Sequence, residues 1–369
     1  MSSPRDPQSV PSQPSPIPHT RAFFTPEDKE AVTSCLSSGM VASGSRVRAF
    51  ESGLASRLGA SDVVTVTSGT AAIVLALRAV GVRHGDEVIL PTYVCRAVYE
   101  AVRYVGGVPV LVDNDEHRCI SRKSVEPFLS PRTKAIVAVD TLGHPVPVDG
   151  LLDTGVPVIE DACQGFAGSF QGRPLGLRGT VGVISFHGTK LLPIGEGGAV
   201  LCTQASVGAR IRAIREGEGD GDDEHARAGT QISDVSAALG NALLARLDAT
   251  LARRAAIAAL YREALASASQ RVALPSADNV PYRFPLRLEG ASAETYDALF
   301  ARFQSQGVSI RRGVDAMNHV LFPARSSGGA SFPVAERDFV ETLSIPLYES
   351  LSDAEVGTVV AALQTVFSS

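Results

Sequence analysis

Short apolar segments with strand character alternate with segments of helical period through the first half of the chain. The strand-like segments are Val63–Thr67, Glu87–Leu90, Pro109–Val112, Ala135–Val139, Val156–Ile159, Gly182–Phe186 and Gly198–Leu201. The helical segments are Thr25–Ser38, Ser45–Leu58, Thr70–Ala79 and Ala97–Val105. Several strands are apolar throughout, as in sheets that are buried on both faces. This order predicts an α/β fold with a mostly parallel central sheet covered by helices.

A length of 369 residues favours two lobes rather than one. Beyond the alternating part, a long helical pattern runs from Ser233 to about Leu265. A smaller α+β unit follows, with strands at Arg283–Leu288 and Val308–Ile310 and helices at Thr295–Gln306 and Ser352–Val366. We therefore expect a Pro- and Ser-rich tail over 1–20, a large domain over 21–245 and a small C-terminal domain over 246–369. The tail is expected to be disordered, or to form an arm on a neighbouring subunit.

Charge and cysteine usage exclude several classes of protein. The net charge of −5 gives no basis for non-specific binding to nucleic acid or to an anionic membrane. No apolar run reaches the ~18–20 residues that span a bilayer, and the first residues lack the apolar core of a signal peptide. The five cysteines are scattered and form no CxxC pair, which argues against a disulfide framework or a structural zinc site. The sequence predicts a cytoplasmic protein.

The motif Thr67-Ser68-Gly69-Thr70 lies between a predicted strand and a predicted helix. Backbone N–H groups at a helix N-terminus, beside hydroxyls and a glycine, suit a phosphate group. The same residues also form an ordinary turn with a helix cap. Taken alone, the motif leaves both interpretations open.

The segment Glu160–Gln164 lies at the carboxyl end of an apolar strand, where ligands bind in open α/β sheets. A buried carboxylate there requires a cationic or hydrogen-bonding partner. Asp161 could face a protonated pyridine nitrogen, which keeps pyridoxal 5′-phosphate (PLP) an effective electron sink. Asp161 could equally be a capping residue satisfied by backbone N–H groups.

Lys190 follows the strand end Ser185-Phe186, roughly thirty residues after Asp161, and precedes the glycine-rich turn Gly195–Gly198. A lysine in this setting can form a Schiff base, although a lone lysine is normally a solvated charge. The order of a phosphate loop, an acidic strand end, a lysine and a glycine-rich turn is typical of fold-type-I PLP enzymes.

From roughly Phe23 to Val366 the chain resembles the DegT/DnrJ/EryC1/StrS aminotransferase family. The further matching blocks are Phe50-Glu51, Gly85–Ile89, Gly107–Val110, Pro131–Ile136, Ser233-Asp234 with Ala237–Gly240, and Leu343–Tyr348. The resemblance implies a PLP-dependent aminotransferase that works as a homodimer with active sites at the interface. It implies that Lys190 carries the cofactor as a Schiff base and shuttles protons, and that Asp161 pairs with the pyridine nitrogen. It also implies that Gln164 occupies the position that contacts the phenolic oxygen of the cofactor. The cofactor phosphate would be bound by Ser68, Gly69, Thr70 and Ser185.

Three positions depart from the family pattern. The aromatic residue that usually stacks on the PLP ring is replaced by Cys95, with Tyr93 two residues earlier, and register slightly favours Cys95. Gly229 stands where the family usually has an Asn that reaches the partner's phosphate, with Arg215, Arg227 or Gln231 as candidate substitutes. Arg311-Arg312 stands in place of a His- and Tyr-rich substrate segment, either as a clamp for a carboxylate or diphosphate or as a solvated pair.

These departures bear on the identity of the amino acceptor more than on the type of reaction. The resemblance predicts transfer of an amino group from a small amino-acid donor, glutamate or glutamine, to a keto or aldehyde intermediate of specialised metabolism. A nucleotide-linked keto-sugar is the second candidate for the acceptor. A PLP-dependent dehydratase is a further alternative, but such relatives replace the lysine with histidine. A regulatory protein that keeps the fold without catalysis is the non-enzymatic alternative.

Overall fold

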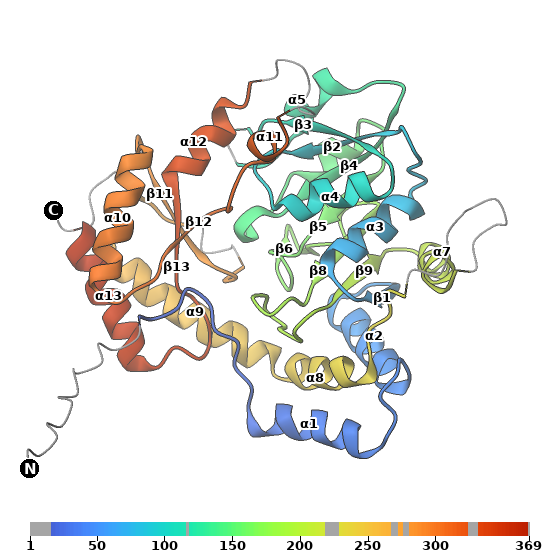
Figure 1. Cartoon of the computed structure of the whole chain (residues 1–369), viewed down its shortest axis with the longest axis horizontal. Coiled ribbons are helices and arrows are strands. Elements are labelled where there is room, and N and C mark those ends of the chain that lie inside the picture. The colour runs from blue at the N-terminus through green and yellow to red at the C-terminus, as the bar shows by residue number, and fades with distance from the viewer. Residues whose placement is uncertain are drawn as a thin grey trace, which may run out of the picture.

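The computed structural model describes residues 16–115, 118–217, 229–266, 272–275, 280–323 and 331–367. Two sheets organise this part of the chain (Figure 1). The large lobe is built around a seven-stranded sheet, and the small lobe around a four-stranded sheet. A two-stranded hairpin, β6 (Ser169–Phe170) and β7 (Arg173–Pro174), forms a third sheet.

The central sheet is mostly parallel, as the sequence predicts. In spatial order its strands are β1 (Asp62–Val66), β9 (Gly198–Cys202), β8 (Val181–Ser185), β5 (Val158–Asp161), β4 (Thr133–Val139), β2 (Glu87–Pro91) and β3 (Val108–Val112). Neighbouring strands from β8 to β3 are parallel, and only β9 runs antiparallel to both of its neighbours. The carboxyl ends of β1, β8, β5, β4, β2 and β3 therefore meet at one edge of the sheet.

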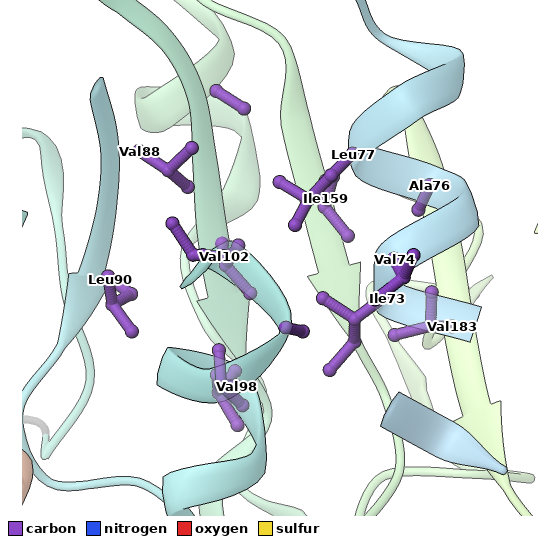
Figure 2. Close-up of a cluster of buried hydrophobic side chains, with 14 of the residues drawn as sticks. Ile73, Val74, Ala76, Leu77, Val88, Leu90, Val98, Val102, Ile159 and Val183 are labelled. Carbon is purple, nitrogen blue, oxygen red and sulfur yellow. The ribbon is translucent and has the colours of Figure 1, made fainter. Parts of the chain in front are cut away.

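Side chains alternate between the two faces of the sheet because successive residues of a strand point in opposite directions. Val88 and Leu90 of β2 pack with the helices of one face, whereas Ile89 packs on the other. The first face is covered by α3 (Gly69–Ala79), α4 (Arg96–Tyr104) and α7 (Ala205–Glu216). Figure 2 shows side chains of α3 and α4 against those of β2, β5 and β8.

The second face is covered by two groups of helices. The short helices α5 (Arg122–Val125) and α6 (Val148–Leu152) pack over β2, β4 and β5. The longer helices α2 (Ser45–Leu58) and α8 (Asp234–Ala245) pack over β1, β8 and β9. The helix α1 (Pro26–Ser37) lies against α8, and the 3-10 turns η1 (Glu126–Phe128) and η2 (Thr141–Gly143) complete the lobe.

Two capping interactions explain where the first helices begin. Thr25 and Asp28 form a capping box around the start of α1, with Pro26 in the first turn. Asp234 accepts hydrogen bonds from the backbone of Gly44 at 2.8 Å and of Val47 at 2.9 Å, so a residue of α8 caps α2. This contact accounts for the conspicuous Ser233-Asp234 block.

The small lobe has an antiparallel sheet and its own core. Its strands, in spatial order, are β10 (Val272–Ala273), β11 (Phe284–Leu288), β13 (Thr342–Ile345) and β12 (Arg311–Arg312). Its helices are α9 (Leu247–Ala264), α10 (Ala293–Ser305), α11 (Asn318–Leu321), α12 (Pro333–Glu341) and α13 (Asp353–Phe367). Asp113 of the large lobe accepts hydrogen bonds from the backbone of Val334 and Ala335, and so joins α12 to the large lobe.

Three details differ from what the sequence predicts. The helical pattern from Ser233 is two helices, because Arg246 leaves helical geometry with φ −107° and ψ 11°. The expected strand Val308–Ile310 is not a strand of the sheet; Val308 forms a single bridge with Ile17, and the strand begins at Arg311. That bridge and a hydrogen bond between His19 and Ser344 hold the end of the expected disordered tail on the small lobe. Residues 1–15 lie outside the described part.

Candidate active site

The predicted site residues gather at the carboxyl edge of the central sheet. Asp161 is the last residue of β5, and Ser185 is the last residue of β8. Ser68 caps α3 directly after β1, with its Oγ accepting from the backbone N–H of Ala71 at 3.0 Å. Parallel strands bring these three positions together although they are far apart in the sequence.

The start of α3 lies so close to β8 and β9 that side chains are excluded there. A Cβ at Gly69 would lie 3.0 Å from the Cβ of Ser185 and 3.4 Å from the Sγ of Cys163. A Cβ at Gly198 would lie 2.5 Å from the carbonyl oxygen of Ser68. Glycine at both positions leaves the backbone N–H groups of the first turn, where Thr70 follows Gly69, open to a ligand. The helix dipole at this end favours an anion.

Asp161 is a buried carboxyl group with few partners. The backbone N–H of Cys163 donates to its Oδ1 at 3.0 Å. Burial raises the pKa of Asp161 above its ordinary value, although hydrogen bonds from Cys163 and the charge of Lys190 act in the opposite direction. A cationic group placed against this carboxylate would keep it ionised.

Lys190 extends towards Tyr282 of the small lobe. Its Nζ donates to the phenolic oxygen of Tyr282 at 3.4 Å and lies 5.0 Å from the centre of the ring. Burial alone would lower the pKa of Lys190. The electrostatic interactions of its ammonium group with Tyr282, Cys163 and Asp161 outweigh this effect, so the pKa is raised. Conversely, burial would raise the pKa of Tyr282, but Lys190 and Arg283 hold it below its ordinary value.

Tyr282 is not among the residues that the sequence indicates. It precedes β11, 92 positions after Lys190, and nothing in its local pattern distinguishes it from any buried aromatic residue. Its place is fixed by Arg254, whose guanidinium donates to the carbonyl oxygen of Tyr282 at 3.2 Å and forms an ion pair with Glu349. The only signal in the sequence is the neighbouring Arg283, a charge directly before an apolar strand.

Gln164 is held at the same edge by a strained turn. Its Oε1 accepts a hydrogen bond from the backbone N–H of Leu142 at 2.9 Å. Leu142 has a φ of 56°, in the left-handed region that bulky residues avoid. Because the side-chain oxygen is engaged, the amide N–H groups of Gln164 remain as donors, which suits a phenolic oxygen as the ligand.

Tyr93 and Cys95 have different surroundings. Tyr93 is buried, and a Cβ at Gly313 would lie 2.2 Å from its hydroxyl oxygen, so its phenol fills the junction with the small lobe. Cys95 is exposed at the start of α4. Burial and the charge of Asp161 raise the pKa of the Cys163 thiol, and Cys95 makes a smaller contribution in the same direction. Tyr93 thus packs inside the lobe junction, whereas Cys95 is accessible from outside.

The residues near Gly229 offer few free side chains. Gly229 has a φ of +56°, so this backbone conformation disfavours most side chains. Arg215 is buried and donates to Glu51 and to the carbonyl oxygen of Thr65, each at 3.1 Å. Gln231 donates to Glu216. Arg227, the third expected substitute, lies outside the described residues, as does most of the acidic stretch Gly217–Glu224.

The two arginines of β12 do not act as a pair in this structure. Arg312 turns into the small lobe, where its guanidinium lies 3.7 Å from the centre of the Tyr296 ring and donates to the carbonyl oxygen of Phe339 at 3.2 Å. Arg311 is exposed on the opposite face of the strand and lies near His19. Alternation along the strand therefore separates the two guanidinium groups and does not form the fork that the sequence suggested.

Glu160 and Asp161 are neighbours with different roles. The side chain of Glu160 is fully buried and accepts hydrogen bonds from Arg178 at 2.6 Å and 2.8 Å. Arg178 also donates to Asp140 at 3.0 Å and to the carbonyl oxygen of Val146 at 2.9 Å. Burial and the charge of Glu160 raise the pKa of Asp140 despite Arg178. This network fixes the end of β5 and so the position of Asp161.

Replacing Arg178 with Met is expected to lower the free energy of unfolding by about 3–5 kcal/mol, because it leaves two buried carboxyl groups without their cation. Urea denaturation of the cofactor-free protein measures this change. The matched control is Arg122→Met, which breaks an exposed pair between Arg122 of α5 and Glu126 of η1 and is expected to cost about 0.5 kcal/mol. Equal losses in the two variants would show that the network does not stabilise the strand end.

The whole chain resembles known aminotransferases in sequence and structure. A profile of the DegT/DnrJ/EryC1/StrS aminotransferase family matches residues 24–364. The chain belongs to this family. It is 30% identical to a GDP-perosamine synthase of Caulobacter vibrioides over 356 residues, which cover 92% of this chain and 95% of that protein.

Two solved structures extend the likeness to the fold. The aminotransferase TlmJ of Streptoalloteichus hindustanus is 28% identical, with a TM-score of 0.86 over 95% of this chain and 98% of its own. DesI, whose structure was determined in the presence of its TDP-sugar product, is 27% identical, with a TM-score of 0.86 over 95% of this chain and 94% of its own. The prediction of a fold-type-I transferase with a mostly parallel large-lobe sheet and a smaller lobe is confirmed.

Membership of the family makes this chain a PLP-dependent aminotransferase, which confirms the predicted activity and cofactor. The residues present fit PLP: the start of α3 is open to a phosphate, and the buried Asp161 carboxylate needs a cation such as a protonated pyridine. Among the described helices, none is both long and apolar enough to cross a membrane.

Proposed function

We propose that the chain transfers an amino group from glutamate or glutamine to a nucleotide-linked keto-sugar. The observation that carries this proposal is the full-length likeness to a GDP-perosamine synthase, together with the likeness to DesI. The sequence places a small keto intermediate of specialised metabolism first and a nucleotide-linked keto-sugar second. The relatives reverse that order. They give no support to a dehydratase or a non-catalytic regulator.

Each residue of the proposed site has a separate task. PLP, when bound, supplies an electron sink for the charge that is left when the donor loses its α-proton. Lys190 attaches the cofactor and then holds and returns that proton on its Nζ. Asp161 keeps the pyridine nitrogen protonated. Ser68, Gly69, Thr70 and Ser185 bind the phosphate, and Gln164 donates to the phenolic oxygen.

Tyr282 extends this set of residues. Its hydroxyl is the hydrogen-bond partner of Lys190, and its lowered pKa reflects that positive charge. It therefore orients the lysine side chain across the junction of the two lobes. The backbone N–H of Cys163 donates to Asp161 and its Sγ lies near Gly69, so Cys163 lies beside both the carboxylate and the start of α3.

We propose that two copies of the chain assemble as a homodimer with active sites at the interface. Exposed apolar side chains gather on α1 and its flanking segments, and such surfaces are often interfaces. These are Phe23, Phe24, Leu36, Met40 and Val41, of which Met40 is 70% exposed. We further propose that the enzyme works in the cytoplasm, where its five free cysteines would stay reduced.

The substrate proposal is tested with a panel of acceptors. With glutamate or glutamine as donor, GDP- and TDP-linked 4-keto-6-deoxyhexoses are expected to react with a kcat/KM at least about 100-fold above that of the same sugar without its nucleotide, a difference of ~2.7 kcal/mol. Efficient amination of unlinked small ketones or aldehydes, with no preference for the nucleotide, would contradict the proposal and favour a small keto or aldehyde intermediate as the acceptor.

A further inference from the structure

Arg283 is a half-buried arginine without an anionic partner beside the proposed active site. Its guanidinium lies 5.2 Å from the centre of the Tyr282 ring. Among the described residues it forms no hydrogen bond or ion pair. Two other arginines differ in this respect: Arg178 has Glu160 as a carboxylate partner, and Arg254 has Glu349.

The surroundings of Arg283 add further positive charge. Burial lowers the pKa of His19 to about 3, and the charges of Arg283 and Arg311 act in the same direction, so this histidine is neutral at pH 7. A hydrogen bond of 3.0 Å between the Nε2 of His19 and the Oγ of Ser344 holds this ring in place. Both guanidinium groups act on the same histidine, and among the described residues neither has a carboxylate partner. A bound anion would supply that partner.

The position of Arg283 relative to Lys190 suggests which anion binds. Lys190 Nζ and the guanidinium of Arg283 each lie about 5 Å from the ring of the same residue, Tyr282. An amino-acid donor presents its amine and its carboxylates within a few ångströms of each other. With its amine near Lys190, such a donor can place a carboxylate against Arg283, whose planar fork suits two oxygen atoms.

We infer that Arg283 binds a carboxylate group of the amino donor and selects dicarboxylic amino acids as donors. This inference rests on the proposed aminotransferase site. It replaces the Arg311-Arg312 pair as the anion-binding element, because Arg312 is engaged with Tyr296 and Phe339. Arg283 is also the residue whose local charge, directly before β11, the sequence alone could have singled out.

The test uses the full-length protein loaded with PLP and compares Arg283→Gln with Arg283→Lys. The control is Arg262→Gln, which removes another half-buried arginine that lies 5.7 Å from an aromatic ring, that of Phe284. The first measurement is the dissociation constant of glutarate, a dicarboxylate without an amine, by calorimetry. The second is the glutamate dependence of a single donor half-reaction, followed by the cofactor absorbance.

Arg283→Gln is expected to weaken glutarate binding at least tenfold, which is ~1.4 kcal/mol. The glutamate concentration for half-maximal rate should rise by a similar factor, while the rate at saturation changes less than about threefold. The glutarate affinity of Arg283→Lys should lie between those of Arg283→Gln and the parent, because lysine keeps the positive charge but not the planar fork of arginine. The control should bind glutarate like the parent.

Unchanged glutarate binding in Arg283→Gln would overturn the inference, as would a defect confined to the acceptor half-reaction. Neither measurement uses the acceptor. An acceptor panel that fails to show a nucleotide-linked keto-sugar therefore contradicts the proposed function and leaves the inference about Arg283 intact.

Discussion

Replacement of Lys190 by Ala is expected to lower kcat about 10⁴-fold or more, because it removes the covalent attachment of the cofactor and the proton carrier together. Each contribution of this kind is typically worth 10²–10⁴-fold. The fold should be retained, since among the described residues the Lys190 side chain makes one hydrogen bond, a 3.4 Å contact with Tyr282. Steady-state kinetics measure the loss, and circular dichroism checks the fold.

The control for this experiment is Lys123→Ala, which removes an exposed lysine on α5 and should leave kcat within about twofold. Addition of a small primary amine to Lys190→Ala is expected to restore part of the activity by supplying a mobile base. A Lys190→Ala variant that keeps more than a few per cent of the parent kcat would rule out Lys190 as the proton carrier.

Replacement of Asp161 by Asn is expected to slow the donor half-reaction about 10²–10³-fold while PLP still binds. The loss corresponds to ~2.7–4 kcal/mol of transition-state stabilisation. The physical reason is that Asn is neutral, so the pyridine nitrogen loses its proton and the cofactor becomes a weaker electron sink. Single-turnover kinetics with glutamate measure the rate, and an absorbance titration measures PLP binding.

The cofactor-free forms provide a structural control for Asp161. Because burial raises the pKa of this carboxyl group, its ionised form costs free energy at neutral pH. The Asn variant without PLP should therefore be at least as stable as the parent, and thermal unfolding checks this. The control is Asp149→Asn, which neutralises an exposed carboxylate of α6. It should change neither the rate of the donor half-reaction nor the thermal stability of the cofactor-free protein. An Asp161→Asn variant as fast as the parent would show that the carboxylate does not act on the ring nitrogen.

Local sequence patterns predict the large lobe well, because its elements carry their own start and stop signals. Thr25 and Pro26 mark the start of α1, and the predicted bounds of α2, Ser45–Leu58, coincide with the observed helix. The break at Arg246 has no such signal, since neither Pro nor Gly stands there. Val308–Ile310 has strand composition, but only Val308 finds a partner, at Ile17 on a distant segment.

The residues of the candidate site also divide into those that local patterns predict and those that depend on contacts between distant segments. Ser68, Asp161, Ser185 and Lys190 could be predicted because each lies at or just beyond a strand end or at a helix start, and parallel strands bring such positions together. Tyr282 and Arg283 come from the other lobe, and their relation to Lys190 depends on how the two lobes meet. Arg311-Arg312 looks like a clamp in the sequence, but strand alternation turns the two side chains apart.

The central claim, that Lys190 is the residue that carries PLP, is tested most directly by reduction with borohydride followed by peptide mapping. The protein is loaded with PLP, reduced and digested, and the modified peptide is identified by mass spectrometry. The expected result is one phosphopyridoxyl group per chain, attached to Lys190. Attachment to any other lysine, or no stable attachment after reduction, would contradict the assignment of the site.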